Sequence, residues 1–282
     1  MIVFLQRLFS GILLGKIGVI EISTNAVKYL SGSKLTSNFD FDRYTYGTVF
    51  TDSGRLGLHN GRLSLKFLND VILPAVFFAI KTLVNSGVKR ENIKIISTAL
   101  LREAKNADEC VDIIKKETEL PVRIISPEEE AVGGISAFLK TTKHDLKDKY
   151  VVGVDIGGGS TEIAVILNNK SVFKKSFKVG MSLGHREPII LPMNIFKDKT
   201  KDIVIVGNGF CLRKTLGLAN NKNAIHDKII PVEEMREMYN QNPNFAPLSE
   251  IYLDLADELG CDYIIGNGTG NIYAELLDKK LD

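Results

Sequence analysis

Hydrophobic and polar positions follow two different periods along this chain of 282 residues. Short apolar runs, such as residues 17–22 (IGVIEI) and 93–97 (IKIIS), predict buried strands. Between them, residues 63–85 keep the helical period despite Pro74, and Gly87 ends the predicted helix. Strands that alternate with helices indicate an α/β fold.

The first half of the chain adds further elements to this pattern. Residues 26–30 and 44–50 are expected to be antiparallel partners of the first strand, and a helix is expected to continue from residue 99 to 117. After a strand at 122–125, Ser126 precedes a proline and three glutamates, which is typical of a helix N-cap. That helix should run to about residue 139.

The most polar stretch in the middle of the chain is residues 141–149 (TTKHDLKDK). We place a domain boundary there, which gives domains 1–142 and 143–282. The second half repeats the opening of the first, because residues 154–162 follow the same strand, turn and strand order as residues 20–25. Two such halves suggest a ligand cleft between domains.

Further strands and helices are expected in the second half of the chain. Strands are expected at 174–179, 203–206 and 263–265, and helices at 232–241, at 248–259 and at the C-terminus. Glycine turns follow two of these strands, GNG at 207–209 and GNGTG at 266–270. Open α/β sheets bind ligands at the carboxyl ends of strands, and we take the first turn as the better candidate.

Residues 151–166 (VVGVDIGGGSTEIAVI) carry the clearest chemical signal. Two apolar strands enclose two acids, Asp155 and Glu162, which are suited to holding a hard divalent cation. The backbone N–H groups of Gly157, Gly158 and Gly159 can approach an anion without Cβ atoms in the way, and Ser160 and Thr161 add hydroxyl donors. The alternative is a glycine-rich β-hairpin that binds no ligand. Such a hairpin does not need two acids and two hydroxyls beside its three glycines.

Composition and charge narrow the function classes. The formal net charge is only +2, so nothing in the whole chain favours nucleic acid as a partner. Cys110, Cys211 and Cys261 are far apart and lack metal-ligand spacing, which favours a reduced, cytoplasmic protein without a disulfide or a zinc site.

The first 15 residues (MIVFLQRLFSGILLG) are apolar apart from Gln6, Arg7 and Ser10. The run is too short and too interrupted for a spanning helix, and it lacks the features of a signal peptide. Two alternatives stay open: an extension packed on the first domain, and a weak membrane contact through residues 1–15. A homodimer also stays open.

Four blocks now occur in one order along the chain: residues 18–30 (GVIEISTNAVKYL), 97–109 (STALLREAKNADE), 125–131 (ISPEEEA) and 151–162 (VVGVDIGGGSTE). Together they resemble the exopolyphosphatase and guanosine pentaphosphate phosphohydrolase (Ppx/GppA) family. The resemblance is strong over residues 17–180, and the last block is its most specific part. It implies two ribonuclease-H-like domains of the actin-like ATPase superfold with a cleft between them.

The resemblance also implies roles for single residues. Asp155 and Glu162 would lie at a magnesium site, and Gly157 to Thr161 would bind substrate phosphates. Glu130 would be the general base that activates water, and Arg102 would help to hold phosphate. The first loop would contribute Glu21 near the metal and Thr24 and Asn25 near phosphate.

Several positions depart from the family pattern. Glu21 stands where the family has aspartate, and Ser23 replaces a glycine. An arginine expected shortly after Gly180 is absent, with Arg186 as the nearest substitute, and the second domain is trimmed between residues 187 and 202. The later loop reads GNGF in place of a glycine- and threonine-rich turn.

Two functions from different classes follow. The first is a magnesium-dependent hydrolase that releases phosphate from polyphosphate or guanosine pentaphosphate by water attack, with Lys174, Lys175 and Lys178 as candidate contacts for a long polyanion. The second is a catalytically weak relative that binds polyphosphate or a nucleotide as a regulator. Kinase or chaperone-type ATPase activity is third, since only the superfold supports it.

Overall fold

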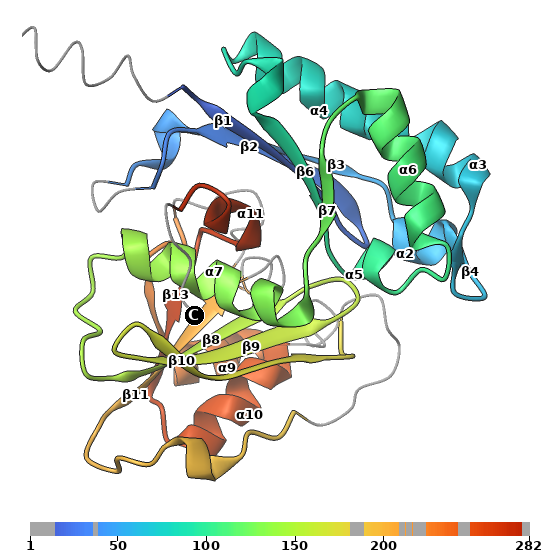
Figure 1. Cartoon of the computed structure of the whole chain (residues 1–282). Coiled ribbons are helices and arrows are strands. Elements are labelled where there is room, and N and C mark those ends of the chain that lie inside the picture. Colours follow the sequence, from blue (N-terminus) through green and yellow to red (C-terminus); the bar gives the residue numbers. More distant parts are fainter. Residues whose placement is uncertain are drawn as a thin grey trace, which may run out of the picture. The chain divides into compact units, whose positions relative to one another are not determined.

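A computed structural model describes residues 15–35, 39–180, 189–208, 212, 216, 224–241 and 249–277. The chain divides into two compact units. Unit 1 comprises residues 1–125 with 276–278, and unit 2 comprises residues 126–275 with 279–282. Figure 1 shows the elements of both units along the chain.

Unit 1 is built on a five-stranded sheet in the order β3-β2-β1-β6-β7. The strands are β1 (Ile17–Ile22), β2 (Ala26–Gly32), β3 (Thr45–Phe50), β6 (Ile93–Ser97) and β7 (Val122–Ile124). The first three strands are antiparallel neighbours, whereas β6 runs parallel to β1, and β7 parallel to β6. The five strands predicted in this half are confirmed.

Two long helical segments pack on this sheet. The first joins α3 (Leu65–Phe67), a π-helical turn (Leu68–Ile72) and α4 (Leu73–Asn85), and the second is α6 (Ala107–Thr118). Smaller elements are 3-10 turns at Phe41–Arg43 and Arg90–Asn92, α2 (Ser53–Leu56), β4 (Leu58–His59), β5 (Arg62–Leu63) and α5 (Ala99–Arg102). Within the described part of the chain, Leu65–Asn85 is the one helix that meets the length and hydropathy of a membrane span, yet its inward side belongs to the unit 1 core.

The helix expected to continue from residue 99 to 117 is two helices, α5 and α6. Between them the buried side chain of Asn106 binds the backbone of Leu63, accepting its N–H at 2.8 Å and donating to its carbonyl oxygen at 2.9 Å. The N–H of Lys105 likewise donates to the carbonyl oxygen of Gly61 at 2.7 Å. These bonds to β5 and the preceding turn replace intrahelical bonds, so the helix breaks there.

Unit 2 contains a six-stranded sheet in the order β10-β9-β8-β11-β13-β12. The strands are β8 (Tyr150–Ile156), β9 (Thr161–Leu167), β10 (Lys170–Phe177), β11 (Ile203–Asn208), β12 (Ile229–Pro231) and β13 (Tyr263–Gly266). β8, β9 and β10 form an antiparallel meander, while β8, β11 and β13 are parallel neighbours. The glycine-rich stretch is therefore a hairpin turn between β8 and β9, as predicted.

Helices cover both faces of this sheet. On one face lies α7 (Pro127–Thr141), whose Val132, Ile135 and Phe138 pack on the inward residues of β8, β9 and β11. On the other face lie α9 (Val232–Gln241) and α10 (Ser249–Leu259), which share a larger apolar core with the sheet. A 3-10 turn at Met193–Ile195 and the short helix α11 (Asn271–Ala274) complete the unit, and Figure 1 shows α11 beside α7.

The two units divide at residues 125 and 126, earlier than the boundary predicted between 142 and 143. The reason is the packing of α7. Its apolar residues join the core of the unit 2 sheet, so the helix belongs with the strands that follow it and not with the strand before it. The polar residues 141–149 therefore connect two elements within unit 2.

Some predicted features lie outside the described residues. They are the apolar residues 1–14, Arg186 with the stretch after Gly180, Cys211, and the end of the GNGF turn. The α/β class with two domains is confirmed by the two sheets and by the structural similarities given below.

Candidate functional site

Four polar side chains from four neighbouring strands form one row across the unit 2 sheet. Ser176 of β10 pairs with Glu162 of β9, Glu162 pairs with Asp155 of β8, and Asp155 pairs with Asn208 of β11. Paired residues of neighbouring strands point to the same face of a sheet, so all four side chains share the face that α7 covers. We call these residues the cross-strand row.

Neutral donors at both ends of the cross-strand row hold its two acids. The hydroxyl of Ser176 donates to Oε1 of Glu162 at 2.8 Å, and Nδ2 of Asn208 donates to Oδ2 of Asp155 at 2.9 Å. Tyr252 of α10 donates to the carbonyl oxygen of Asn208 and lies 3.3 Å from that of Val154. Side-chain hydrogen bonds thus hold both carboxylates, and Tyr252 holds the backbone beside Asp155.

The glycine turn lies directly beside the two acids. It is closed by a hydrogen bond from the N–H of Gly157 to the carbonyl oxygen of Ser160 at 2.9 Å. Gly180 packs on this turn so closely that a Cβ at its position would lie 2.5 Å from the carbonyl oxygen of Gly158 and 2.6 Å from the N atom of Ser160. Gly180 is therefore required for the close approach of the two backbone segments.

The hydroxyls predicted to bind phosphate are both engaged within unit 2. Thr161 is buried and its hydroxyl donates to the carbonyl oxygen of Val179 at 2.7 Å. Ser160 is also buried and hydrogen-bonds the carboxyl of Glu162. In contrast, Gly157, Gly158 and Gly159 are half-exposed, so the turn offers backbone to a ligand more readily than hydroxyls.

The first turn of α7 adds a third acid to the cross-strand row. Ser126 and Glu129 form a capping box, with the Glu129 N–H donating to the Ser126 hydroxyl at 3.1 Å and the Glu129 carboxylate accepting from the Ser126 N–H at 3.3 Å. Glu128 is exposed. Glu130, which is half-buried, is the glutamate close enough to act on the charge of Glu162.

The electrostatics of Glu162 show that the site is crowded with negative charge. Burial is the first cause that raises its pKa well above the ordinary value, and repulsion from Glu130 and Asp155 raises it further. Hydrogen bonds from Ser160 and Ser176 act in the opposite direction and do not cancel the rise. A positive charge beside Glu162 would relieve this repulsion.

A magnesium ion fits this donor set in part. Within the described residues, no group of three or more His, Cys, Asp or Glu side chains is arranged to hold a metal by itself. Magnesium is usually held by one or two carboxylates together with water and substrate phosphate oxygens. Asp155 and Glu162, adjacent in the register, supply the two carboxylates of such a partial set.

The remaining predicted site residues lie in unit 1. Glu21 is buried and accepts a hydrogen bond from Nζ of Lys28 at 2.6 Å, across the β1–β2 pair. The carbonyl oxygens of Thr24 and Asn25 accept from the N–H groups of Gly54 and Thr51 at 2.7 and 2.9 Å.

Arg102, at the end of α5, donates to the carbonyl oxygen of Ile125 at 3.2 Å. Glu21, Thr24, Asn25 and Arg102 all lie near the carboxyl ends of β1 and β6 in the chain. The predicted residues therefore fall into two sets, one in each unit.

Ser176 and Asn208 are the members of the site that sequence reasoning did not assign. Asn208 lies within the GNG turn that was singled out, so its place after a strand was a usable signal. Ser176 stands between lysines and Phe177 on an edge strand, and no sequence feature marks it. Only the register of β9 and β10 brings it to Glu162.

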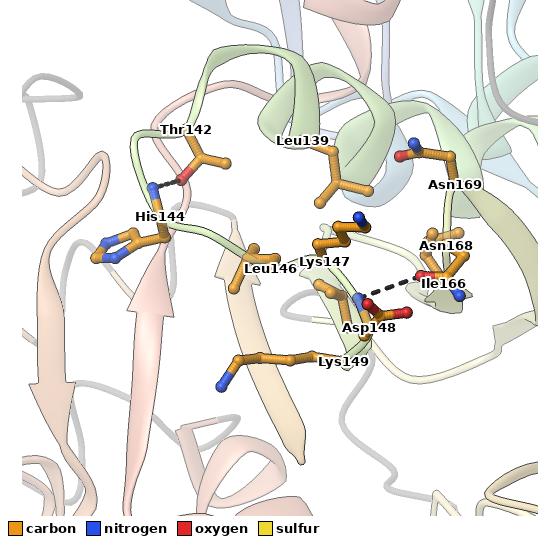
Figure 2. A pocket seen from close by; sticks show the side chains of 11 residues that line it. Leu139, Thr142, His144, Leu146, Lys147, Asp148, Lys149, Ile166, Asn168 and Asn169 are labelled. Atoms are coloured by element: carbon orange, nitrogen blue, oxygen red, sulfur yellow. Dashed lines mark hydrogen bonds between the residues drawn. The ribbon is translucent and has the colours of Figure 1, made fainter. Parts of the chain in front are cut away.

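A cavity of about 350 Å³ lies at the opposite end of the β8–β9 hairpin (Figure 2). Val151 and Ile166, which pair at that end, contribute to its lining together with Leu139 and Leu146. Figure 2 shows the N–H of Asp148 donating to Asn168 Oδ1, at 3.2 Å, on its rim. The cavity is thus separate from the cross-strand row.

The chain is similar to a known protein family and to solved structures. The model of the Ppx/GppA phosphatase family matches residues 70–185. In fold, the chain is similar to the crystal structure of the Aquifex aeolicus member of the Ppx/GppA family, with a TM-score of 0.68 and 19% identity over 93% of this chain and 96% of that one. An exopolyphosphatase from Cytophaga hutchinsonii gives a TM-score of 0.63 and 17% identity, over 94% and 92% of the two chains. At these identities the structures establish the fold.

Two curated relatives are similar over a shorter part. A bifunctional 3-dehydroquinate synthase/phosphatase of Fusobacterium nucleatum is 25% identical over 58% of this chain, and Retrograde regulation protein 2 of Saccharomyces cerevisiae is 24% identical over 57%. The aligned part spans only 24% and 28% of these two proteins. The family model confirms the predicted resemblance over residues 70–185, and the solved structures confirm the fold that it implies.

Proposed function

We propose that this chain, which resembles the Ppx/GppA phosphatase family, is a magnesium-dependent hydrolase that releases phosphate from polyphosphate or guanosine pentaphosphate. The observation that carries the proposal is the cross-strand row with Glu130 beside it. Two fixed acids, a half-exposed glycine turn and a third acid at a helix start can supply the positioning and charge neutralisation on which phosphoanhydride hydrolysis depends.

Each residue of the site has a task in the proposed reaction. The half-exposed backbone at Gly157 to Gly159 binds terminal phosphate oxygens through N–H groups. Glu130 accepts a proton from a water molecule as the water oxygen attacks the terminal phosphorus. The bond from that phosphorus to the bridging oxygen breaks, and the shortened chain leaves with the bridging oxygen. Because Glu130 is half-buried and not enclosed, it can pass the proton on to solvent.

Asp155 and Glu162 are the residues that would hold magnesium, which supplies neutralisation of phosphate charge when bound. Ser176 and Asn208 keep the two carboxylates in place for that task. The buried, repelled charge of Glu162 supports a cation at this position, because neither hydroxyl nor amide donors carry a positive charge.

Lysine side chains near the cross-strand row favour polyphosphate as the substrate. Lys174 lies on the same face of β10 as Ser176 by the period of two, Lys178 follows directly after the strand, and both lysines are exposed. The solved structure from Cytophaga hutchinsonii is described as an exopolyphosphatase, which fits the same substrate class. The exposed ammonium groups on β10 and directly after it would neutralise part of the charge of a long polyanion.

Phosphate release from long-chain polyphosphate and from guanosine pentaphosphate tests the proposal, with magnesium and with EDTA. We expect release with magnesium only, and a loss of about 100-fold or more in kcat for Glu130→Gln, since general bases contribute roughly 10²–10⁴. The matched control is Glu128→Gln, an exposed glutamate in the same helical turn. No release from either substrate would sink the hydrolase, and equal rates for the two variants would remove Glu130 as the base.

One observation favours the second function, a binding protein without strong catalysis. Glu21, expected beside the metal, is already paired with Lys28 at 2.6 Å, and both lie in unit 1. One of the relatives carries a name that refers to regulation. Tight binding of polyphosphate by equilibrium dialysis, together with no phosphate release at any magnesium concentration, is the result that would select this function.

A further inference from the structure

The outward side of α4 in unit 1 carries an apolar stripe. Phe77 is 42% exposed, Phe78 is 54% exposed and Val84 is 43% exposed. At 100° per residue, these three side chains lie within about 120° of one another around the helix axis, and Pro74 and Lys81 lie in the same arc. The inward side of the helix, including Val76, Ile80 and Leu83, is buried in the unit 1 core.

The stripe has a fixed geometry on the unit 1 sheet. The ring of Phe78 meets that of Tyr29 on β2 edge to face, with centroids 6.2 Å apart. An aromatic pair in this arrangement holds the ring in one orientation. Phe77 and Phe78 are adjacent and exposed, and Phe78 is held by Tyr29, so the pair forms a continuous apolar surface, in contrast to the scattered single apolar residues of an ordinary exterior.

Basic residues lie within the stripe and at the C-terminal end of α4. Lys81 is the single charged residue of α4 and stands within the arc. At the C-terminal end of the helix, Lys16 donates to the carbonyl oxygen of Ser86 at 2.7 Å, and exposed Lys89 and Arg90 follow in the chain. The acids nearest in sequence are Glu91 and Asp70, and Asp70 is already paired with Lys66. Arg90 donates to the carbonyl oxygen of Thr118 at 2.6 Å, so the basic residues that this part of unit 1 offers are Lys81 in the stripe and Lys16 and Lys89 at the end of the helix.

This combination matches an anionic lipid surface. Phenylalanine side chains insert at the level of the upper acyl chains, and lysine or arginine side chains reach the phosphate groups above them. Each basic residue near an anionic bilayer contributes about 1 kcal/mol of attraction. We propose that the α4 stripe (Phe77, Phe78, Lys81 and Val84) is a membrane-contact surface that binds bilayers containing anionic phospholipid.

Two other occupants fit less well. In a symmetric pair of chains joined through this face, Lys81 would lie close to its own symmetry mate, and like charges at the centre of an interface are unfavourable. Insertion of the whole helix across a bilayer would expose the core residues of unit 1, because the inward side of α4 packs on the sheet. A shallow contact through the outward side keeps the fold intact.

Co-sedimentation of the full chain with vesicles tests the surface. The vesicles contain either phosphatidylcholine alone or phosphatidylcholine with about 30% phosphatidylglycerol. We expect binding to the second kind only, a fall of about tenfold in the bound-to-free ratio for F77S/F78S, and a further dependence on salt. The matched control is V172S/I190S, which removes two exposed apolar residues of unit 2 and should bind like the wild type.

Further measurements separate the other occupants. Circular dichroism melting shows whether F77S/F78S is folded, and K81E provides a second variant that keeps both rings. Equal vesicle binding by the wild type, F77S/F78S and K81E would overturn the proposal. So would a concentration-dependent dimer in analytical ultracentrifugation that F77S/F78S abolishes.

A truncated chain tests whether the apolar residues 1–14, which lie outside the described part, account for the binding. A chain that lacks them should still bind phosphatidylglycerol vesicles through α4. Complete loss of binding in that truncated chain, with no effect of F77S/F78S in the full chain, would assign the contact to residues 1–14 and contradict the α4 stripe.

Discussion

At the scale of single residues, the two acids of the cross-strand row depend on neighbours that carry no charge. Asn208 holds Asp155 and Ser176 holds Glu162, each through one hydrogen bond of ordinary length. Outer partners of metal-binding carboxylates set their orientation and are often nearly as important as the ligands themselves.

We therefore expect Asn208→Ala and Ser176→Ala to weaken magnesium binding by about 10-fold or more. The measurement is the rise of the thermal midpoint with magnesium concentration, which does not require activity. Ser171→Ala is the matched control, because Ser171 lies on the same strand but hydrogen-bonds the carbonyl oxygen of Phe173. Unchanged magnesium affinity in both site variants would show that the acids need no such support.

Glu162 makes stability depend on pH when no metal is bound. Its raised pKa means that the folded state holds the proton more tightly than the unfolded state. The stabilisation from this proton is complete below the ordinary pKa of about 4.3 and is lost as the pH rises through the pKa of the folded state. A tenfold difference in proton affinity between the two states corresponds to about 1.4 kcal/mol of free energy of unfolding.

Glu162→Gln removes this dependence, because glutamine cannot ionise. In EDTA, the variant should gain stability relative to the wild type between pH 4 and pH 8, as measured by urea unfolding. Added magnesium should reverse part of the gain by stabilising the wild type. With Glu128→Gln as control, a difference that stays constant with pH would contradict the buried charge at Glu162.

At the scale of elements, two adjacent glycines fit α7 against its neighbours in unit 2. A Cβ at Gly133 would lie 2.1 Å from Oδ1 of Asn271 and 3.3 Å from Cβ of Ala274 in α11. At Gly134 the nearest atoms are 3.6 Å away and belong to Asn208 and Asp155. The first glycine permits the contact between helices, and the second has room for a methyl group.

Gly133→Ala should therefore lower the free energy of unfolding by about 1 kcal/mol or more, since overpacking typically costs about 1–3 kcal/mol. Gly134→Ala is the matched variant in the same helix. It should leave stability unchanged or raise it by about 0.5–1 kcal/mol, because alanine favours a helix over glycine. Urea unfolding of both variants checks this, and equal destabilisation would argue against the α7–α11 contact.

At the scale of the whole molecule, each unit contains one described cysteine. Cys110 belongs to unit 1 and Cys261 to unit 2, and burial raises the pKa of both thiols to about 11. Cys110 is buried and Cys261 is partly buried, so each thiol should react slowly at neutral pH and faster when its unit opens. Labelling of each thiol therefore reports on one unit.

We expect magnesium to protect Cys261 and to leave Cys110 unaffected, since the cross-strand row lies in unit 2. In chains with Cys211→Ser and one further cysteine replaced, labelling of Cys261 should slow by about tenfold when magnesium is about ten times its dissociation constant. Labelling by a thiol reagent at about pH 7.5, with EDTA buffer as the reference, measures it. Protection of Cys110 alone would contradict this prediction and assign the metal site to unit 1.

The sequence by itself determined the α/β class, most strands and the acids of the glycine hairpin. These features depend on local patterns: apolar runs predict strands, Ser126 before Pro127 predicts the N-cap of α7, and acids beside three glycines mark an anion or metal site. Local signals of this kind act within a few residues, so they can be read without knowing the fold.

Only the tertiary structure decided which distant residues meet the acids. The register of β10 brings Ser176 to Glu162, the parallel neighbour β11 brings Asn208 to Asp155, and the packing of α7 moves the unit boundary to residue 125. The break between α5 and α6 likewise follows from Asn106 binding Leu63. Such contacts join residues far apart in the chain, and strand register and helix packing, which no local pattern encodes, determine them.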